Sequence, residues 1–464
     1  MIENRQLRIK RSQVLVPDGI PEAVERAANH RALRWYVGQI GADEVVVEAT
    51  VDSEEIGDLG AGVANRHFPG KAVAVSIIPT GVGCSIGGYA GDAAPASRLL
   101  ASTVDYLVTN PNAVNASDFI QVEGNTLYTE GYCIDLFCRG LVDLHVPVAN
   151  RVGVVVERAC DANLDQVFNV INAVRAVHGI DIAHCVVTDR PIGSRCRRNQ
   201  TGGYVGTVDH PEILTEACRR LLERGAEAVA VTTNVQDLPV EDYARHFAGQ
   251  IPNPVGGVEA IISHLVVDRF RVPAAHAPMM TTRNLPLSEA VVDARGAGEM
   301  ASLSGLACIL VGLARAPQIA LRPGRLVRDS VNINNLLAVV APASCLGGIP
   351  TLFADRARVP TIAVRGNRSI LDVTAGRLGL RHVVEVANYA EAAGILLALR
   401  LGISLEALGR PLATLRHTVA SEREALPDAA GVVDEAALPL ALQVAQGPSP
   451  VRVPLDTAGE VEIR

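Results

Sequence analysis

Short apolar runs alternate along the chain with longer segments in which apolar residues recur at helical spacing. The pattern predicts strands at residues 151–156 and 184–188, and helices at residues 164–178, 211–224 and 389–401. The apolar runs are continuous rather than alternating, which is typical of strands buried on both faces of a parallel sheet. Strands that alternate with helices in this way indicate a layered α/β protein.

One unit recurs in the sequence: an apolar run, a loop that ends in a glycine pair, a helical stretch and a second apolar run. Residues 228–275 and 336–364 match most clearly, and residues 72–108 form a looser copy. The glycine pairs are Gly87-Gly88, Gly256-Gly257 and Gly347-Gly348. We therefore predict three pseudo-repeats of strand, glycine turn, helix and strand, packed around a common site.

The length of 464 residues predicts two or three domains, because single cores stop growing at about 250–300 residues. We expect a first α/β unit with an N-terminal extension at residues 1–150 and a second unit at residues 151–300. A third unit with a C-terminal tail is expected at residues 301–464.

Composition narrows the classes of partner. A chain that is 48% hydrophobic can form a sizeable core, which excludes disorder as its main state. Its net charge of −8 argues against nucleic acid as a partner, since nucleic-acid binders normally carry a basic surface. The basic residues include only two lysines, Lys10 and Lys71, so a Schiff base or a Ser–Lys pair would depend on one of these two.

The cysteines and the N-terminus bear on the compartment. The nine cysteines are scattered without paired CxxC spacing, which indicates a reducing compartment. The first residues are polar, and no apolar run approaches the roughly 18 residues of a membrane helix. We expect a cytoplasmic protein with no membrane partner and a possible homo-oligomeric state.

The densest chemical signal is the glycine-rich stretch 79–92, which lies between a predicted strand and a predicted helix. Glycines there permit close backbone approach, and the following helix directs free N–H groups into the loop, so the amides of Gly87 and Gly88 are candidate anion ligands. The spacing matches neither a Walker A loop nor GxGxxG. A tight turn without a ligand is the alternative.

Nucleophiles stand at two of the three equivalent positions before the glycine pairs. These positions are Ser85, Pro254 and Cys345, and Cys84 lies beside the first. A thiol near a helix N-terminus has a lowered pKa and is a better nucleophile or base. We take Cys84, Ser85 and Cys345 as candidate catalytic residues, with buried packing as the alternative for the cysteines.

Polar residues that follow predicted strands are candidate substrate ligands. Asn110 and Asn112 follow the strand of the first unit, and Arg365 and Asn367 follow that of the third. Amides and a guanidinium at such an edge can hold a carboxylate or an amide. Gly256, Gly257, Gly347 and Gly348 complete the expected binding set. A second basic segment, residues 195–203 with Arg195 and Arg198, is interpreted as a flexible loop.

In the second unit, Glu259 lies in the first turn of the helix and His276 follows the strand at residues 273–275. Both are candidate acid or base groups. The alternatives are a helix-dipole role for the glutamate and a hydrogen-bonded structural role for the histidine. No HExxH or Cys/His zinc spacing occurs, so we expect neither a metal nor another cofactor.

Two resemblances follow from these segments. The stretch 79–119, with residues 256–264 and 383–389, resembles a bacterial family defined only as a domain of unknown function. The Gly-Gly-Val-Glu-Ala stretch from Gly256 is also similar to the Gly-Gly-Thr-Glu-Gly stretch of the cyanuric acid hydrolase and barbiturase family. That likeness implies an architecture of three repeats, but Ile86, Val255 and Leu346 stand where the family has serine.

Three functions remain open at this point. The first is a cofactor-independent hydrolase of a small cyclic amide, imide or lactone bound at glycine-rich helix N-termini. The second is a cysteine-dependent racemase or isomerase of a small carboxylate. The third is a non-catalytic protein that binds a small ligand. In each case the expected partner is a small molecule that is anionic or rich in carbonyl groups.

Overall fold

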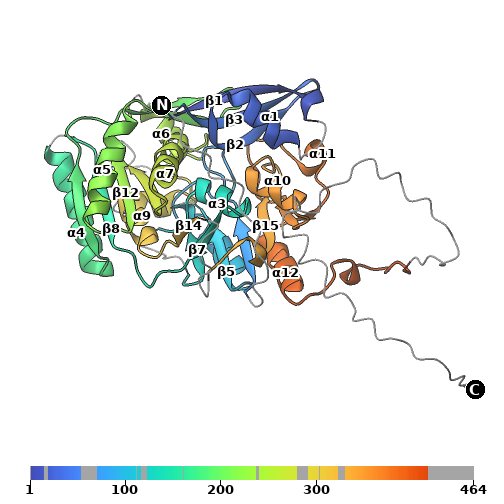
Figure 1. The fold of residues 1–464 in the computed structure, drawn as a ribbon. Helices are drawn as coiled ribbons and strands as arrows, with labels where there is room; N and C mark the ends of the chain where they lie inside the picture. Colours follow the sequence, from blue (N-terminus) through green and yellow to red (C-terminus); the bar gives the residue numbers. More distant parts are fainter. Residues whose placement is uncertain are drawn as a thin grey trace, which may run out of the picture.

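The computed structural model describes residues 2–14, 19–53, 71–110, 112–116, 123–159, 161–236, 240–279, 291–302, 304–321 and 330–415. Figure 1 shows an antiparallel sheet along one side of the molecule and two helix-covered regions beneath it. The helices α4 (Asp161–His178) and α5 (Pro211–Glu223) lie at one end, and α12 (Tyr389–Arg400) lies towards the other.

The antiparallel sheet has the strand order β10-β11-β1-β3-β2. Its strands are β1 (Ile2–Lys10), β2 (Arg31–Ile40), β3 (Glu44–Asp52), β10 (Ser194–Arg198) and β11 (Tyr204–Val208). Helix α1 (Gly19–Ala28) packs on this sheet through Ile20, Val24 and Ala28. The expectation of a flexible loop at residues 195–203 is therefore wrong for Arg195–Arg198, which form an edge strand that pairs with β11, whereas residues 199–203 form the turn between these strands. The side chains alternate between buried and exposed there, and the charges mark the solvent face.

A six-stranded sheet has the order β17-β16-β15-β4-β5-β6, and all neighbouring strands are parallel. Its strands are β4 (Val73–Ser76), β5 (Tyr106–Thr109), β6 (Thr126–Tyr128), β15 (Leu336–Pro342), β16 (Thr361–Val364) and β17 (Val383–Val386). Successive residues of β4 face opposite cores: Ala74 packs with α2 (Ala94–Ala101) and α12, whereas Val73 and Val75 face the main core. Helices α3 (Gly131–Cys138) and α10 (Ile349–Arg356) belong to that core.

A four-stranded sheet has the order β13-β12-β8-β9 and is also parallel. Its strands are β8 (Val152–Val156), β9 (Ile182–Val187), β12 (Ala228–Thr233) and β13 (Ala274–Pro278). Helices α4 and α9 (Gly305–Leu313) cover one face, and α5 and α7 (Gly256–Phe270) cover the other.

Shorter elements complete the described chain. Strands β7 (Val142–His145) and β14 (Gln318–Leu321) form an antiparallel pair. The remaining helices are α6 (Val240–Phe247), α8 (Ala297–Ala301), α11 (Ala375–Leu378), η1 (Arg11–Gln13), η2 (Asn112–Val114), η4 (Ile333–Asn335) and η5 (Glu406–Leu408).

The mixed α/β class with parallel sheets and alternating strands and helices is confirmed. Each glycine-pair unit joins two parallel strands through one or two helices: β4-α2-β5, β12-α6-α7-β13 and β15-α10-β16. The first and third crossovers share the six-stranded sheet, whereas the second lies in the other parallel sheet. The arrangement of three equivalent repeats around one site stays a prediction, as do the boundaries near residues 150 and 300.

The order of the six-stranded sheet reverses between β4 and β15. From β4 the chain continues to β5 and β6 on one side, and from β15 it continues to β16 and β17 on the other. The loops after β4 and β15 therefore meet at the carboxyl edge, where open α/β sheets commonly bind ligands.

The first turn of α7 packs tightly enough to require glycine. A Cβ at Gly257 would lie 2.5 Å from the carbonyl oxygen of Tyr204 and 2.7 Å from Cα of Val205. Both contacts are with the backbone of β11, so relief would require the helix to shift.

We predict that Gly257→Ala lowers the free energy of unfolding by about 1–3 kcal/mol, because the new methyl group overpacks this contact. The matched control is Gly394→Ala on α12, where nothing lies within 4 Å of the added Cβ. That variant should gain roughly 0.5–1 kcal/mol from helix propensity. Urea denaturation of both variants measures the difference, and equal effects would contradict the packing described for α7.

Candidate functional site

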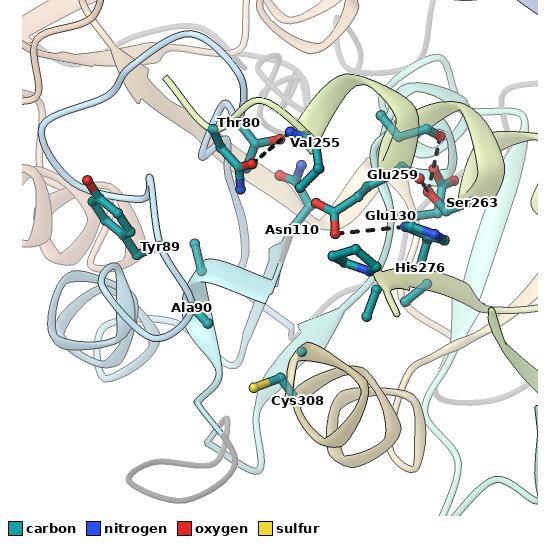
Figure 2. A pocket seen from close by; sticks show the side chains of 18 of the residues that line it. Thr80, Tyr89, Ala90, Asn110, Glu130, Val255, Glu259, Ser263, His276 and Cys308 are labelled. Atoms are coloured by element: carbon teal, nitrogen blue, oxygen red, sulfur yellow. Dashed lines mark hydrogen bonds and ion pairs between the residues drawn. The ribbon is translucent and has the colours of Figure 1, made fainter. Parts of the chain in front are cut away.

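A cavity of about 140 Å³ lies at the carboxyl ends of β4, β5 and β6, facing α7 and β13 (Figure 2). A cavity of roughly 150 Å³ can hold a benzene-sized ring, so this one suits a small cyclic molecule. Its polar lining comes from elements far apart in the sequence: Arg34, Thr80, Asn110, Glu130, Asn253, Glu259, Ser263, His264, His276, Glu299, Ser302 and Ser304. The cavity therefore lies between the two parallel sheets, and Arg34 of β2 is the residue that the antiparallel sheet contributes to this polar set.

Glycines bring the two halves of this wall together. Gly81, in the loop after β4, has φ +72°, and a Cβ at Gly256 would lie 3.2 Å from its backbone nitrogen. Gly256 is the first residue of α7 and lines the cavity. The absence of side chains at these positions lets the N-terminus of α7 reach the loop.

Glu259 and His276 face each other across this cavity, as Figure 2 shows. An oxygen of Glu259 lies 3.8 Å from Nδ1 of His276. Nε2 of the histidine is hydrogen-bonded to the Thr233 hydroxyl at 2.8 Å, and that hydroxyl pairs with Ser194 at 2.8 Å. The histidine is buried, whereas the glutamate side chain is 21% exposed. The imidazole is thus fixed from behind, and Glu259 is the member that can reach a ligand.

Glu299 is a second carboxyl group in the lining. Its pKa is raised to about 7, mainly by burial and also by the charge of Glu259, while the Ala90 N–H and the Tyr243 hydroxyl oppose this rise. That N–H donates to Oε2 at 2.9 Å, and the Tyr243 hydroxyl also donates to the carboxylate. A carboxyl group with a pKa near 7 can both accept and return a proton at neutral pH.

Glu130 is a different kind of carboxylate. It caps α3 by accepting from the backbone N–H groups of Tyr132 and Cys133 at 2.9 and 2.5 Å, and it is paired with Nδ1 of His264. Burial lowers the pKa of His264, so the neutral ring donates to the carboxylate. This carboxylate is already satisfied by its partners and stabilises the start of α3.

Among the buried polar atoms of the lining, Oδ1 of Asn110 and the hydroxyl oxygens of Ser302 and Ser304 have no hydrogen-bond partner in the part of the chain that the structure describes. Unpaired buried polar atoms are costly and uncommon in folded proteins. Their gathering around one cavity indicates that a polar ligand completes them.

The expected anion ligands, Gly87 and Gly88, also line the cavity, but their amides have a partner within the chain. Both N–H groups donate to Oδ2 of Asp92, at 2.6 and 3.3 Å. Burial raises the pKa of Asp92, and the two N–H groups oppose that shift. A carboxylate of the protein thus occupies the position that we expected an anion to take.

The candidate nucleophiles lie apart from this cavity. Cys84 and Cys345 are buried and lie close enough to shift each other's pKa, and Cys84 lines a smaller neighbouring cavity. The hydroxyl of Ser85 donates to the carbonyl oxygen of Arg368 at 3.3 Å. The structure therefore separates the five candidate catalytic residues into two groups, Glu259 with His276 and Cys84 with Cys345, and Ser85 belongs to neither.

The remaining candidate ligands are divided in the same way. Asn110 and Gly256 line the larger cavity, whereas Gly257 packs on β11 and Asn112 opens η2. Gly347 and Gly348 lie at β2, where the Gly347 carbonyl accepts from Val37 at 2.8 Å and Gly348 bridges to Tyr36.

Two predicted ligands from the third unit also lie outside the lining. Asn367 is buried and holds both backbone groups of Ile86, and Arg365 is exposed. Asn367 therefore joins the third unit to the glycine loop of the first.

Sequence reasoning missed Glu299, Ser302, Ser304 and Arg34. Glu299 lies in the five-residue helix α8, where an acidic residue in the first turn suits the helix dipole and carries no sign of burial. Ser302 and Ser304 have no distinguishing spacing.

The comparisons with known proteins agree with the first resemblance. Residues 73–409 match the family described as Protein of unknown function (DUF3326). The chain belongs to this family. A relative from Synechococcus sp., an uncharacterized lipoprotein, is 37% identical to the DUF3326 chain over 353 residues, covering 74% of this chain and 96% of that protein. No solved structure matches. The likeness to the cyanuric acid hydrolases gains no support from these matches.

Two features of the described residues bear on membrane and metal partners. None of the helices found there combines the length and apolar character that crossing a bilayer requires. Within the same ranges, no group of three or more His, Cys, Asp or Glu side chains is placed to hold a metal ion.

We predict that Ser302→Ala leaves the free energy of unfolding of the ligand-free protein unchanged or raises it by about 1 kcal/mol, because it removes an unpaired buried hydroxyl. The matched control is Ser194→Ala, which removes a buried hydroxyl that is hydrogen-bonded to Thr233. That change should cost about 1–2 kcal/mol. Denaturation of both variants without ligand measures the contrast, and a loss at Ser302 as large as that at Ser194 would mean that the Ser302 hydroxyl is already satisfied.

Proposed function

We propose that this protein is a cofactor-independent hydrolase of a small cyclic amide or imide, which binds in the larger cavity. The observation that carries the proposal is the set of three unpartnered polar atoms beside Glu299: Oδ1 of Asn110 and the hydroxyls of Ser302 and Ser304. A cavity with a few convergent polar groups and a carboxyl group of raised pKa is typical of an active site.

The hydrogen-bonding character of these atoms favours one substrate class. Oδ1 of Asn110 is an acceptor, so its partner must be an N–H or O–H donor. The two serine hydroxyls can donate to carbonyl oxygens. A ring with an N–H group beside one or two carbonyls satisfies both requirements, whereas a lactone lacks the N–H. The volume of about 140 Å³ suits a ring of five or six atoms, roughly the size of benzene.

The reaction follows from the carboxyl group of Glu299. In its ionised form it accepts a proton from a water molecule, and the water oxygen forms a bond to the carbonyl carbon. The C–N bond then breaks, and the proton held by Glu299 passes to the leaving nitrogen. The products are one carboxyl group and one amine or amide on the opened ring, and Glu299 returns to its starting state.

Two features would stabilise the transition state. The N-terminus of α7 lies at the cavity through Gly256, so its dipole favours negative charge on the carbonyl oxygen. The serine hydroxyls supply directed donors. Glu259, held by His276, keeps a negative charge near Glu299 and helps to maintain the raised pKa of that group.

The three glycine turns contribute to different degrees in this proposal. Gly87, Gly88 and Gly256 form part of the cavity, and Gly347 and Gly348 support the sheet arrangement. A common ancestral repeat of strand, glycine turn, helix and strand is compatible with this division, because one helix N-terminus at the cavity is enough for a single substrate.

A racemase or isomerase with two thiol bases is the second candidate, favoured by the meeting of Cys84 and Cys345. Such an enzyme needs its bases on opposite faces of a substrate carbon. Here the thiols contact each other and lie outside the cavity with the unpartnered polar atoms, so the hydrolase is the better-supported function.

We propose a cytoplasmic location on the basis of nine cysteines without paired spacing. The name of the Synechococcus relative, a lipoprotein, favours a membrane-anchored location instead. Fractionation of cells that express the natural gene distinguishes the two, because an anchored protein sediments with membranes and a cytoplasmic one does not.

We predict that the full chain opens the rings of succinimide or hydantoin, and that γ-butyrolactone is a poorer substrate. NMR signals of the ring carbons measure the opening. Glu299→Gln should lower kcat/KM by about 10²–10⁴-fold, the usual contribution of a positioned acid or base. Because the base acts when ionised, kcat/KM should rise with pH through about 7 and then level. The control Glu223→Gln alters an exposed carboxyl group on α5 and should leave both unchanged.

Full activity of Glu299→Gln would exclude its role as the base. Binding of these rings without any ring opening would favour the non-catalytic function, and exchange of a substrate α-hydrogen with solvent deuterium would favour the isomerase.

A further inference from the structure

Cys84 and Cys345 meet where the order of the six-stranded sheet reverses. Cys84 lies in the loop after β4 and Cys345 in the loop after β15, so 260 positions of sequence separate two neighbouring thiols. Their exposed fractions are 2% and 9%, and the two thiols lie close enough to shift each other's pKa. The hydrolase proposed above makes no use of this pair.

A third segment holds both cysteine loops in place. Residues 367–373 bind the first loop through two backbone bonds, from Ser85 N–H to the Arg368 carbonyl at 2.8 Å and from Ile370 N–H to the Val82 carbonyl at 3.1 Å. The same segment binds the second loop through Val373, which exchanges backbone hydrogen bonds of 2.9 Å with Ser344 and Leu346. The two thiols are therefore held together by backbone on either side, and no large movement is needed for them to react.

The surroundings of Cys345 favour its thiolate. The hydroxyl of Ser369 lies 3.0 Å from its sulfur and that of Ser344 lies 3.9 Å away. Hydrogen bonds from Cys84 and from these hydroxyls lower the pKa of Cys345, and the same shared proton together with burial raises the pKa of Cys84. Cys345 is thus the member of the pair that ionises more readily, and the thiolate is the form of cysteine that attacks an oxidant.

A small oxidant has a route to the pair. Cys84 lines the smaller cavity of about 110 Å³, together with Gly83, Pro252 and Ile370. That volume admits a molecule of the size of hydrogen peroxide. Other described cysteines lack this combination: Cys218 is fully buried, and burial alone raises its pKa.

We propose that Cys84 and Cys345 form a reversible disulfide when the protein meets a peroxide. The Cys345 thiolate attacks one oxygen of the peroxide, the O–O bond breaks, and the leaving hydroxide takes the proton of Cys84 to form water. The Cys84 thiolate then attacks the sulfenic acid sulfur, and the S–O bond breaks. The leaving hydroxide takes up the proton that Cys345 released to solvent when it ionised, which gives a second water. Two thiols are oxidised, one peroxide is reduced, and a dithiol reverses the reaction by exchange.

The bond would tie together the two halves of the six-stranded sheet at their junction. It would also fix the loop that leads from Cys84 to Gly87, Gly88 and Ala90 in the wall of the larger cavity. The oxidation state of the Cys84–Cys345 pair would therefore affect the shape of the larger cavity through the backbone of this loop.

The test is treatment of the folded full chain with excess hydrogen peroxide, alkylation of the remaining thiols, and peptide mapping by mass spectrometry without reduction. We expect a linked pair of peptides containing Cys84 and Cys345, with the loss of two hydrogen masses, that disappears after dithiothreitol. Cys84→Ser and Cys345→Ser should each lack the linked pair, whereas the matched control Cys218→Ser should retain it.

Wild-type protein alone decides the outcome if a variant fails to fold. The proposal is overturned if both thiols of the oxidised protein remain fully alkylatable after unfolding, or if the half-buried Cys185 is oxidised while the pair is not. Overoxidation of Cys345 to a sulfinic acid without any linked peptide would overturn it as well, because Cys84 would then have failed to resolve the sulfenic acid.

Discussion

The approach of the α7 N-terminus to the loop after β4 is the constraint on which the candidate site depends. Gly81 adopts a positive φ of +72°, and a Cβ at Gly256 would lie 3.2 Å from the backbone nitrogen of Gly81. A side chain at Gly256 would therefore push the start of α7 away from the loop. Through this contact the carboxyl edge of the six-stranded sheet faces α7 and β13 of the other parallel sheet, and the cavity is the space that remains between them. A displaced α7 would separate Glu259 from the glycine loop, so packing and chemistry rest on the same few glycines.

The buried carboxylates show which groups serve the fold and which remain for chemistry. Glu157 accepts from the backbone N–H groups of Ile192, Gly193 and Asn234, at 2.5, 3.3 and 2.5 Å, and Glu130 accepts from two backbone N–H groups and from His264. Glu299 has one backbone donor and the Tyr243 hydroxyl, and its pKa is raised to about 7. Carboxylates with full sets of donors serve the fold. The incompletely satisfied one is suited to exchange a proton.

Local patterns in the sequence predicted the elements that carry the parallel sheets. The apolar runs at residues 151–156 and 106–108 are close to β8 and β5, and the periodic segments at 164–178 and 389–401 are close to α4 and α12. The order of the strands was not predictable in this way. Strands β4 and β15 pair although some 260 residues separate them, and neither sequence contains a signal that identifies its partner. The N-terminal antiparallel sheet also carries no turn signal that links β1 to β11.

The candidate site was predictable only in part, for the same reason. Glu259, His276, Asn110 and Gly256 were recognisable from their places at helix starts and strand ends, and all four line the cavity. Glu299 became visible only through its raised pKa, and Ser302 and Ser304 only through their missing partners, all of which are properties of the folded chain. Cys84 and Cys345 were expected to share a site with Glu259, but the turn at Gly347 docks on β2 and directs the third unit away from α7.

The central claim is that the folded chain keeps Glu299 poised between its two protonation states at neutral pH. The most direct measurement is the pH titration of its side-chain carboxyl carbon by NMR in protein labelled with ¹³C-glutamate, with the resonance assigned by its absence in Glu299→Gln. The account predicts a midpoint near about 7, the value that burial gives this carboxyl group. A midpoint near the ordinary glutamate value of 4.5 would contradict it, because Glu299 would then be a solvated carboxylate with no proton to exchange.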